Sequence, residues 1–217
     1  MDYETARFNM IEQQIRPWEV LDPVVLDLLF KVKREDFVPP VYRSLAFADM
    51  DVPLGHGEAM WAPKIEARAL QAVQVQRHEK VLEVGTGSGY LTALLANLAG
   101  QVVSVELVRE FRDEAERKLR AHGFTNITLK AGDAAQDWAD DGQFDVIVLT
   151  GSTPVLPRAY QKRLNRGGRL FAIVGEGAAM SARLVTHVAH GAYAEEALFE
   201  TSVKALKNAL EPERFVF

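Results

Sequence analysis

Apolar residues recur at helical spacing through the first forty residues of the chain. Phe8, Ile11 and Ile15 fall on one face of a helix. Asp22 and Pro23 then supply a cap and a first-turn proline for a second segment with an apolar stripe. Because both stripes need a core to pack against, we expect the chain to begin with helices that lie on a larger body.

The pattern loosens between Met50 and Trp61 and becomes helical again at Pro63, a residue that suits the first turn of a helix. The intervening stretch DVPLGHGEAMWAPK shows neither a helical nor a strand period. It is expected to be a loop that runs into a helix.

From Lys80 onward, short apolar runs alternate with amphipathic segments. The runs KVLEVG, VVSVE, NITLKAGD, FDVIVLTG and GGRLFAIVGE are typical of buried strands, and helices are expected between them, near 109–122 and 155–164. This alternation predicts an α/β fold with a doubly wound, mostly parallel sheet. The β-rich tail after residue 183 leaves little room for helices, which favours antiparallel strands at one edge.

Length and composition limit the organisation and the partners. A chain of 217 residues is expected to form a single domain, with N-terminal helices and a loop in residues 1–78 and the α/β core with C-terminal strands in residues 79–217. A net charge of -5 with scattered basic residues argues against binding to nucleic acid. There is no cysteine, and the histidines lack metal-ligand spacing, so no metal is expected.

The expected compartment is the cytoplasm, and no membrane partner is expected. The N-terminal residues MDYETARFNM have acids where a signal peptide needs basic residues followed by an apolar run. No apolar run in the chain approaches the roughly 20 residues that span a bilayer.

The segment VLEVGTGSGYLTALLANL combines a buried strand, a glycine loop and a helix. Gly85, Gly87 and Gly89 occupy positions where a side chain would obstruct a ligand that approaches the backbone N–H groups and the helix N-terminus. The loop fails the dinucleotide pattern because residue 90 is tyrosine, and it lacks the Gly-Lys-Ser/Thr ending of a phosphate loop. A ligand without phosphates is therefore favoured.

Two acids follow the next two predicted strands. Glu106 closes VVSVE, where a carboxylate can accept hydrogen bonds from both hydroxyls of a ribose. Asp133 follows the third strand, where an acid can accept a hydrogen bond from an adenine amino group. A glycine loop alone could be only a tight turn, but three polar elements at successive strand ends favour a cofactor site.

These motifs resemble those of class I S-adenosylmethionine-dependent methyltransferases, and the flanking segments from Phe37 to Glu176 resemble the protein-L-isoaspartate O-methyltransferase family. The resemblance implies S-adenosylmethionine as cofactor, S-adenosylhomocysteine as product, and methyl transfer to a carboxylate of altered aspartyl residues in proteins. The implied cofactor contacts are Glu83, Gly85, Thr86, Gly87, Gly89, Glu106, Leu107, Gly132, Asp133, Ala134 and Thr150. The first five surround the methionine portion, Glu106 holds the ribose, and residues 132–134 face the adenine.

The chain departs from the family in the loop that holds the acceptor. The family has Gly-x-Gly-Gln-Thr-Ile-Ser, whose hydroxyls hold the substrate carboxylate beside the methyl group, whereas the aligned residues here are Glu58, Ala59, Met60 and Trp61. Loss of one oxyanion donor costs a factor of about 10² to 10³ in rate. Glu58 would also repel an anionic acceptor if it pointed into the site. Trp61 offers an aromatic face, or else Met60 and Trp61 only pack the loop against the sheet.

Three functions remain open on these grounds. The first is an isoaspartyl O-methyltransferase, which needs no general base because a carboxylate with a reference pKa near 4 is ionised at neutral pH. The second is a methyltransferase of the same fold with another acceptor, and the third is a noncatalytic module that binds the cofactor. The partner is a protein, a peptide or a small molecule, and the chain is a monomer or a homodimer.

Overall fold

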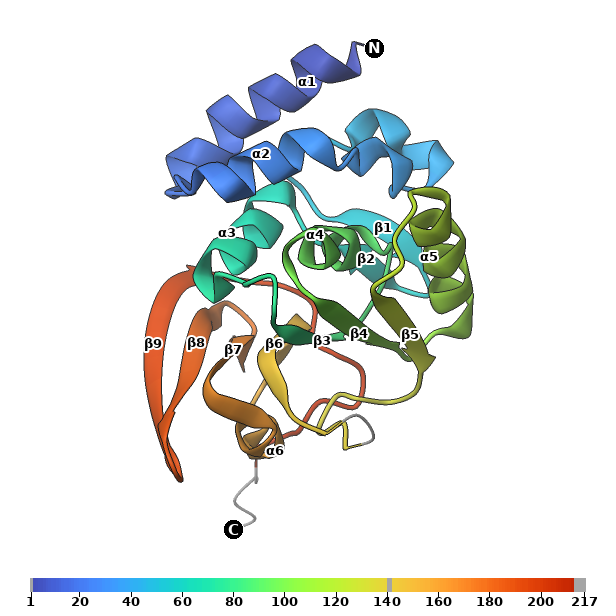
Figure 1. Cartoon of the computed structure of the whole chain (residues 1–217). Helices are drawn as coiled ribbons and strands as arrows, with labels where there is room; N and C mark the ends of the chain where they lie inside the picture. The colour runs from blue at the N-terminus through green and yellow to red at the C-terminus, as the bar shows by residue number, and fades with distance from the viewer. Residues whose placement is uncertain (1, 140–141, 213–217) are drawn as a thin grey trace.

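The computed structural model describes residues 2–139 and 142–212 of the chain. Within them, seven strands form one sheet in the order β5-β4-β3-β6-β7-β8-β9 (Figure 1). Pairs from β5 to β7 are parallel, and β8 and β9 are added antiparallel at one edge. The predicted mostly parallel sheet with antiparallel C-terminal strands is therefore confirmed. The bounds are β3 Lys80–Val84, β4 Gln101–Glu106, β5 Ile127–Ala131, β6 Phe144–Thr153, β7 Leu164–Glu176, β8 Ala179–Ala189 and β9 Ala192–Thr201.

Successive residues of the central strands point to opposite faces of the sheet, and each face buries its own hydrophobic core. On β3, Val81 belongs to one core, whereas Leu82 and Val84 belong to the other. Because the central strands bury apolar side chains on both faces, their sequences are continuous apolar runs rather than alternating apolar and polar residues.

Helices cover both faces of the sheet (Figure 1). The first core contains residues of α3 (Pro63–Val73), α4 (Tyr90–Leu98) and α5 (Arg109–Ala121). The second core contains Tyr160 of the short helix α6 (Arg158–Lys162). The helix predicted at 155–164 is therefore shorter than expected, because Pro157 precedes it and β7 begins at residue 164.

The N-terminal helices lie on the far side of α3 and α4 from the sheet (Figure 1). Helix α1 (Tyr3–Met10) continues into a π-helical turn, Ile11–Ile15, and Asp22 caps α2 (Pro23–Lys31) as predicted. Ile11 and Ile15 are fully buried, but Phe8 is 53% exposed, so its predicted place on the buried face is wrong. The π-helical turn has i→i+5 hydrogen bonds, which change the phase of the helix between these positions.

Further 3-10 turns span Arg16–Trp18, Arg34–Asp36 and Pro40–Leu45. Across the described part of the chain, no helix has the length and apolar character required to cross a lipid bilayer.

The stretch predicted as a loop before α3 is a β-hairpin, so that prediction is wrong. Strands β1 (Val52–Gly55) and β2 (Glu58–Met60) pair antiparallel, and their turn has positive φ angles at Gly55, His56 and Gly57. Strands of three and four residues are too short to show a period, which explains why the pattern gave no strand signal. Helix α3 begins at Pro63 as expected.

Candidate active site

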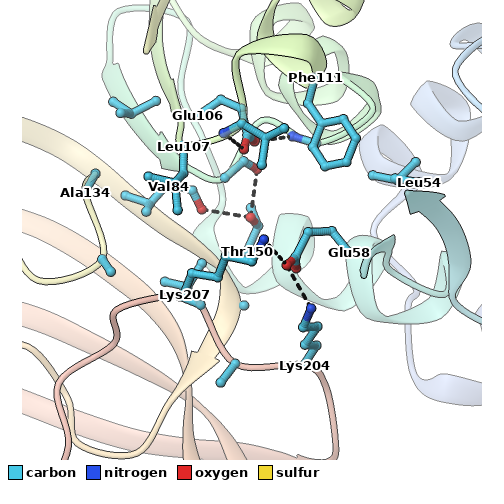
Figure 2. Close-up of a pocket in the computed structure, with 18 of the residues that line it drawn as sticks. Leu54, Glu58, Val84, Glu106, Leu107, Phe111, Ala134, Thr150, Lys204 and Lys207 are labelled. Carbon is cyan, nitrogen blue, oxygen red and sulfur yellow. Dashed lines mark hydrogen bonds and ion pairs between the residues drawn. The ribbon is translucent and has the colours of Figure 1, made fainter. Parts of the chain in front are cut away.

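The order of the strands reverses beside β3, because β4 and β5 lie on one side of it and β6 and β7 on the other. Ligands of open α/β sheets bind at the carboxyl ends of the strands at such a point. A pocket that is partly open to solvent lies there (Figure 2). Its wall is formed by the loops that follow β3, β4 and β5, by Thr150 and Gly151 of β6, by the β1-β2 hairpin and by residues 204–207.

Most of the predicted cofactor residues meet in this pocket. Glu83 and Thr86 line a smaller adjoining pocket, whereas Gly89 lines neither and instead occupies the N-cap position of α4. The predicted residues that line the main pocket are Gly85, Gly87, Glu106, Leu107, Gly132, Asp133, Ala134 and Thr150.

The glycine loop is held close to the end of β6. A Cβ atom added at Gly85 would lie 2.3 Å from the Thr150 hydroxyl oxygen, and the φ of Gly85 is +96°. The Thr150 hydroxyl lies 2.7 Å from both the Val84 and the Gly85 carbonyl oxygens, to which it donates. Only glycine satisfies both the close approach and the positive φ at this position.

Glu106 presents a carboxylate to the pocket from the end of β4 (Figure 2). One oxygen accepts a hydrogen bond from the Gly87 N–H at 2.8 Å, and the other accepts one from the Val108 N–H at 2.9 Å. These two bonds fix the orientation of a buried side chain. Each oxygen keeps a further lone pair, so the carboxylate can accept two hydroxyl groups of a sugar.

Glu83 is fully buried beneath the glycine loop. Its Oε2 atom accepts hydrogen bonds from the Thr92 and Ser104 hydroxyls at 2.5 and 2.6 Å, while Oε1 has no partner among the described residues. Burial raises the pKa of this carboxyl to about 8, although both hydroxyl bonds act in the opposite direction. A buried carboxylate oxygen without a partner fits a cationic ammonium donor in the adjoining pocket.

Asp133 lies at the other end of the main pocket. Its Oδ1 atom accepts a hydrogen bond from the Ala135 N–H at 3.0 Å, and Oδ2 accepts one from the Asn208 side chain at 2.6 Å. The contact from Asn208 was not predicted, because this residue is 75 positions away and follows no periodic pattern.

The residues aligned with the acceptor loop lie on the β1-β2 hairpin and at its end. Glu58, Ala59 and Trp61 line the main pocket, and Met60 lines the smaller one. Trp61 is 6% exposed and packs edge-to-face on Phe171, with 6.4 Å between ring centroids. The indole therefore packs the hairpin against the sheet and also forms part of the pocket wall.

Buried ionic contacts anchor the base of the hairpin. Arg34 donates to the Trp61 carbonyl oxygen at 2.6 Å, and it also contacts Glu66 of α3. The Glu66 side chain lines the smaller pocket. Burial raises the pKa of Glu66 to about 7, although the neighbouring Arg34 charge opposes this shift.

Glu58 carries the expected negative charge into the pocket, but that charge is paired. Lys204 and Lys207 contact the same carboxylate oxygen, Oε1, at 2.8 and 3.1 Å. Partial burial favours a higher pKa, but hydrogen bonds and charge from the two lysines outweigh it and lower the pKa of Glu58. The expected repulsion of an anionic acceptor by Glu58 is therefore offset by two cations.

Both lysines belong to a C-terminal segment, residues 203–208, that sequence reasoning did not assign to the site. Its main chain pairs with Ser152, which donates to the Lys204 carbonyl and accepts from the Leu206 N–H, both at 2.9 Å. Leu206 packs against Gly151. The segment thus crosses the pocket from the hairpin to Asp133. No periodicity marks it, although two lysines three residues apart after the last strand were a visible signal.

No group of three or more histidine, aspartate and glutamate residues could hold a metal ion within residues 2–139 and 142–212. Asp140 and Asp141, in the acidic stretch DWADDGQFD, lie outside the described residues.

A family model described as protein-L-isoaspartate(D-aspartate) O-methyltransferase matches residues 6–203. The chain belongs to this family. The resemblance indicated by the glycine loop and its flanking motifs is thereby confirmed.

Curated relatives carry the same name. Protein-L-isoaspartate O-methyltransferase 1 of Rhodopseudomonas palustris is 38% identical over 80% of this chain and 71% of its own length. Protein-L-isoaspartate O-methyltransferase of Methanoculleus marisnigri is 39% identical over 78% of this chain and 77% of its own length. These matches place the chain among S-adenosylmethionine-dependent methyltransferases.

Solved structures share the fold. One described as a protein-L-isoaspartate O-methyltransferase from Plasmodium falciparum, in complex with S-adenosyl-L-homocysteine, has a TM-score of 0.77 at 19% identity and covers 95% of this chain and 98% of its own. Another structure of that name has a TM-score of 0.76 at 21% identity over 94% of this chain, which spans 65% of that longer chain.

Proposed function

We propose that the chain is an S-adenosylmethionine-dependent O-methyltransferase that methylates the carboxylate of isoaspartyl residues in proteins and peptides. The observation that carries this proposal is the pocket at the switch point of the sheet. One end of the pocket is suited to an adenosyl and methionyl group. The other end meets the hairpin that aligns with the family's acceptor loop.

The cofactor would be held by polar groups at three strand ends. Glu106 would accept the ribose hydroxyls, and Gly132 to Ala134 would face the adenine. Oε1 of Glu83, which is buried without a partner among the described residues, would accept the ammonium group of the methionine portion. The bound cofactor supplies an electrophilic methyl group on a sulfonium.

The acceptor attacks the methyl carbon in line with the carbon–sulfur bond, and the neutral thioether is a good leaving group. The residues of the chain therefore only have to align the acceptor and exclude water. Leu54 and Trp61 provide apolar surface on the hairpin side of the pocket. A carboxylate acceptor is already ionised at neutral pH, so no side chain needs to remove a proton.

A second candidate is a methyltransferase with another acceptor. The observation that favours it is the hairpin itself, where Ala59 and Trp61 replace the family's two hydroxyl residues and the buried indole forms part of the wall.

The test is a labelled-methyl assay on an isoaspartyl peptide, with the matching aspartyl peptide as control and calorimetry with S-adenosylmethionine beside it. We expect cofactor binding and transfer to the isoaspartyl peptide alone. Binding without transfer to either peptide would support the second candidate or a noncatalytic module, and absence of binding would refute the cofactor site.

The hairpin variant Ala59→Thr distinguishes the two candidates further. Ala59 lines the pocket and is exposed, so a threonine fits without disturbing the core. If isoaspartate is the acceptor, the restored hydroxyl should raise kcat/KM for an isoaspartyl peptide about tenfold. This gain is smaller than the factor of about 10² to 10³ that an oxyanion donor contributes in other sites. An unchanged kcat/KM would count against the alignment of the hairpin with the family's acceptor loop.

A further inference from the structure

Two ammonium groups converge at the acceptor end of the pocket. Lys204 and Lys207 extend from the C-terminal segment toward Glu58 on the hairpin (Figure 2). Their side chains are 48% and 42% exposed, and both residues line the pocket. They are therefore within reach of a ligand that enters from solvent.

Each ammonium group has a donor to spare. A lysine ammonium has three N–H donors. Among the described residues, Lys204 contacts Glu58 and the Gly57 carbonyl oxygen, and Lys207 contacts Glu58 and the His56 carbonyl oxygen at 3.4 Å. One N–H of each lysine is left for a further acceptor.

The hydroxyl groups that line the two pockets are already engaged. Thr150 donates to carbonyl oxygens of the glycine loop, and the Thr86 hydroxyl lies 2.6 Å from that of Ser104. The Ser88 hydroxyl accepts a hydrogen bond from the Tyr90 N–H at 3.2 Å and keeps its own donor, but it lines only the smaller pocket. In the main pocket, where Glu58 and the two lysines lie, no serine or threonine hydroxyl is therefore left to replace those that the hairpin lacks.

We propose that Lys204 and Lys207 bind the carboxylate of the methyl acceptor, and that Glu58 holds their ammonium groups in position. The inference rests on the proposed function insofar as the acceptor is a carboxylate. The two cations balance the charges of Glu58 and Asp51, the acids that line this end of the pocket, so an anionic acceptor enters without net repulsion.

Glu58 has a definite part in this arrangement. It lies between two like charges that would otherwise repel each other, and it draws both side chains to one point of the wall. A carboxylate that enters can then accept one charge-assisted hydrogen bond from each lysine. The substrate class is a carboxylic acid presented on a short, exposed branch, such as the α-carboxylate of an isoaspartyl residue.

The experiment compares KM and kcat for a carboxylate acceptor in three variants: Lys204→Met/Lys207→Met, Glu58→Gln, and the triple variant. We expect the double variant to raise KM about tenfold or more, as for loss of a charge-assisted hydrogen bond, with an unchanged affinity for S-adenosylmethionine. Glu58→Gln should raise KM, but by less than the double variant does, because the lysines keep their charges and lose only the group that orients them. The matched control is Lys31→Met/Lys33→Met, which removes two exposed lysines outside the pocket.

The triple variant separates binding from a merely structural contact. If the lysines bind the acceptor, KM rises further, by several-fold or more, from Glu58→Gln to the triple variant, because the lysines still donate charge-assisted hydrogen bonds to the acceptor when Glu58 no longer orients them. If they only fasten the hairpin through Glu58, the triple variant has the same KM as Glu58→Gln, and the proposal is overturned.

A panel of acceptors keeps this inference distinct from the proposed function. It contains an isoaspartyl peptide, small mono- and dicarboxylic acids, and an acceptor without a carboxylate. Methylation of another carboxylate that depends on both lysines would uphold the inference while refuting isoaspartate as substrate. Methylation of the acceptor without a carboxylate alone, or of no acceptor, would overturn it.

Discussion

The two ends of the pocket are built from different kinds of contact. At the cofactor end, Glu106 is oriented by backbone N–H groups, and Glu83 is locked by hydroxyls beneath the glycine loop. At the acceptor end, the tip of the hairpin is held through Glu58 by two half-exposed lysines. The first depends on the sheet itself, whereas the second depends on side chains that can be exchanged without altering the sheet. The acceptor is therefore the more changeable part of the function.

The base of the hairpin contrasts with its tip, because it rests on a buried charge. Arg34 is 1% exposed and contacts the Trp61 and Ala46 carbonyl oxygens as well as Glu66. Arg34→Met leaves Glu66 buried without its cation, so we expect the free energy of unfolding to fall by about 3 to 5 kcal/mol. Denaturant unfolding followed by circular dichroism measures this.

The control for this prediction is Arg16→Met, which removes an exposed ion pair with Glu12 and should cost less than about 1 kcal/mol. The double variant Arg34→Met/Glu66→Met should recover much of the loss, since no unpaired charge remains. Equal stability of Arg34→Met and Arg16→Met would mean that the buried contact does not anchor the hairpin.

The cofactor end can be tested through Glu106. We expect Glu106→Ala to weaken binding of S-adenosylmethionine about 10- to 100-fold. The substitution removes a charged acceptor of hydrogen bonds and also the bond that fixes the Gly87 N–H of the glycine loop. Calorimetry gives the dissociation constant, and the exposed neighbour Glu110→Ala serves as control. An unchanged dissociation constant would remove Glu106 from the ribose site.

The sequence allowed the cofactor end to be predicted but only part of the acceptor end. Gly85, Glu106 and Asp133 stand at fixed places relative to apolar runs, and parallel strands bring such places together. Lys204 lines the pocket and Asn208 contacts Asp133 only because the chain returns to β6 after β9, a tertiary contact without a periodic signal. The hairpin was missed for a related reason, since its strands are too short for alternation to appear.

The buried carboxyl at the cofactor end has a definite pH dependence. The pKa of Glu83 is raised to about 8 from an ordinary value of 4.5, so between these pH values the folded chain binds more protons than the unfolded chain. Its contribution to stability is complete below pH 4.5 and is lost as the pH rises toward 8, with a slope of up to about 1.4 kcal/mol per pH unit.

Unfolding of the cofactor-free chain across pH 5 to 8 measures this slope, and Glu83→Gln should reduce it. Glu66, whose pKa is raised to about 7, contributes a slope of the same sign, so some dependence should remain in the variant. A slope that is identical in the two proteins would show that Glu83 is ionised in the folded chain.

The carboxylate at the acceptor end should respond to pH in the opposite sense, and more weakly. The lysines lower the pKa of Glu58 below 4.5, so its stabilising effect is present above that value and is lost as the pH falls through the folded-state pKa. Because the group is partly exposed, we expect this effect to be below about 1 kcal/mol. It should disappear in Glu58→Gln and shrink at high salt, when unfolding is followed between pH 3 and 5. A loss at acid pH that survives both changes would place its origin elsewhere and leave Glu58 unpaired with the lysines in solution.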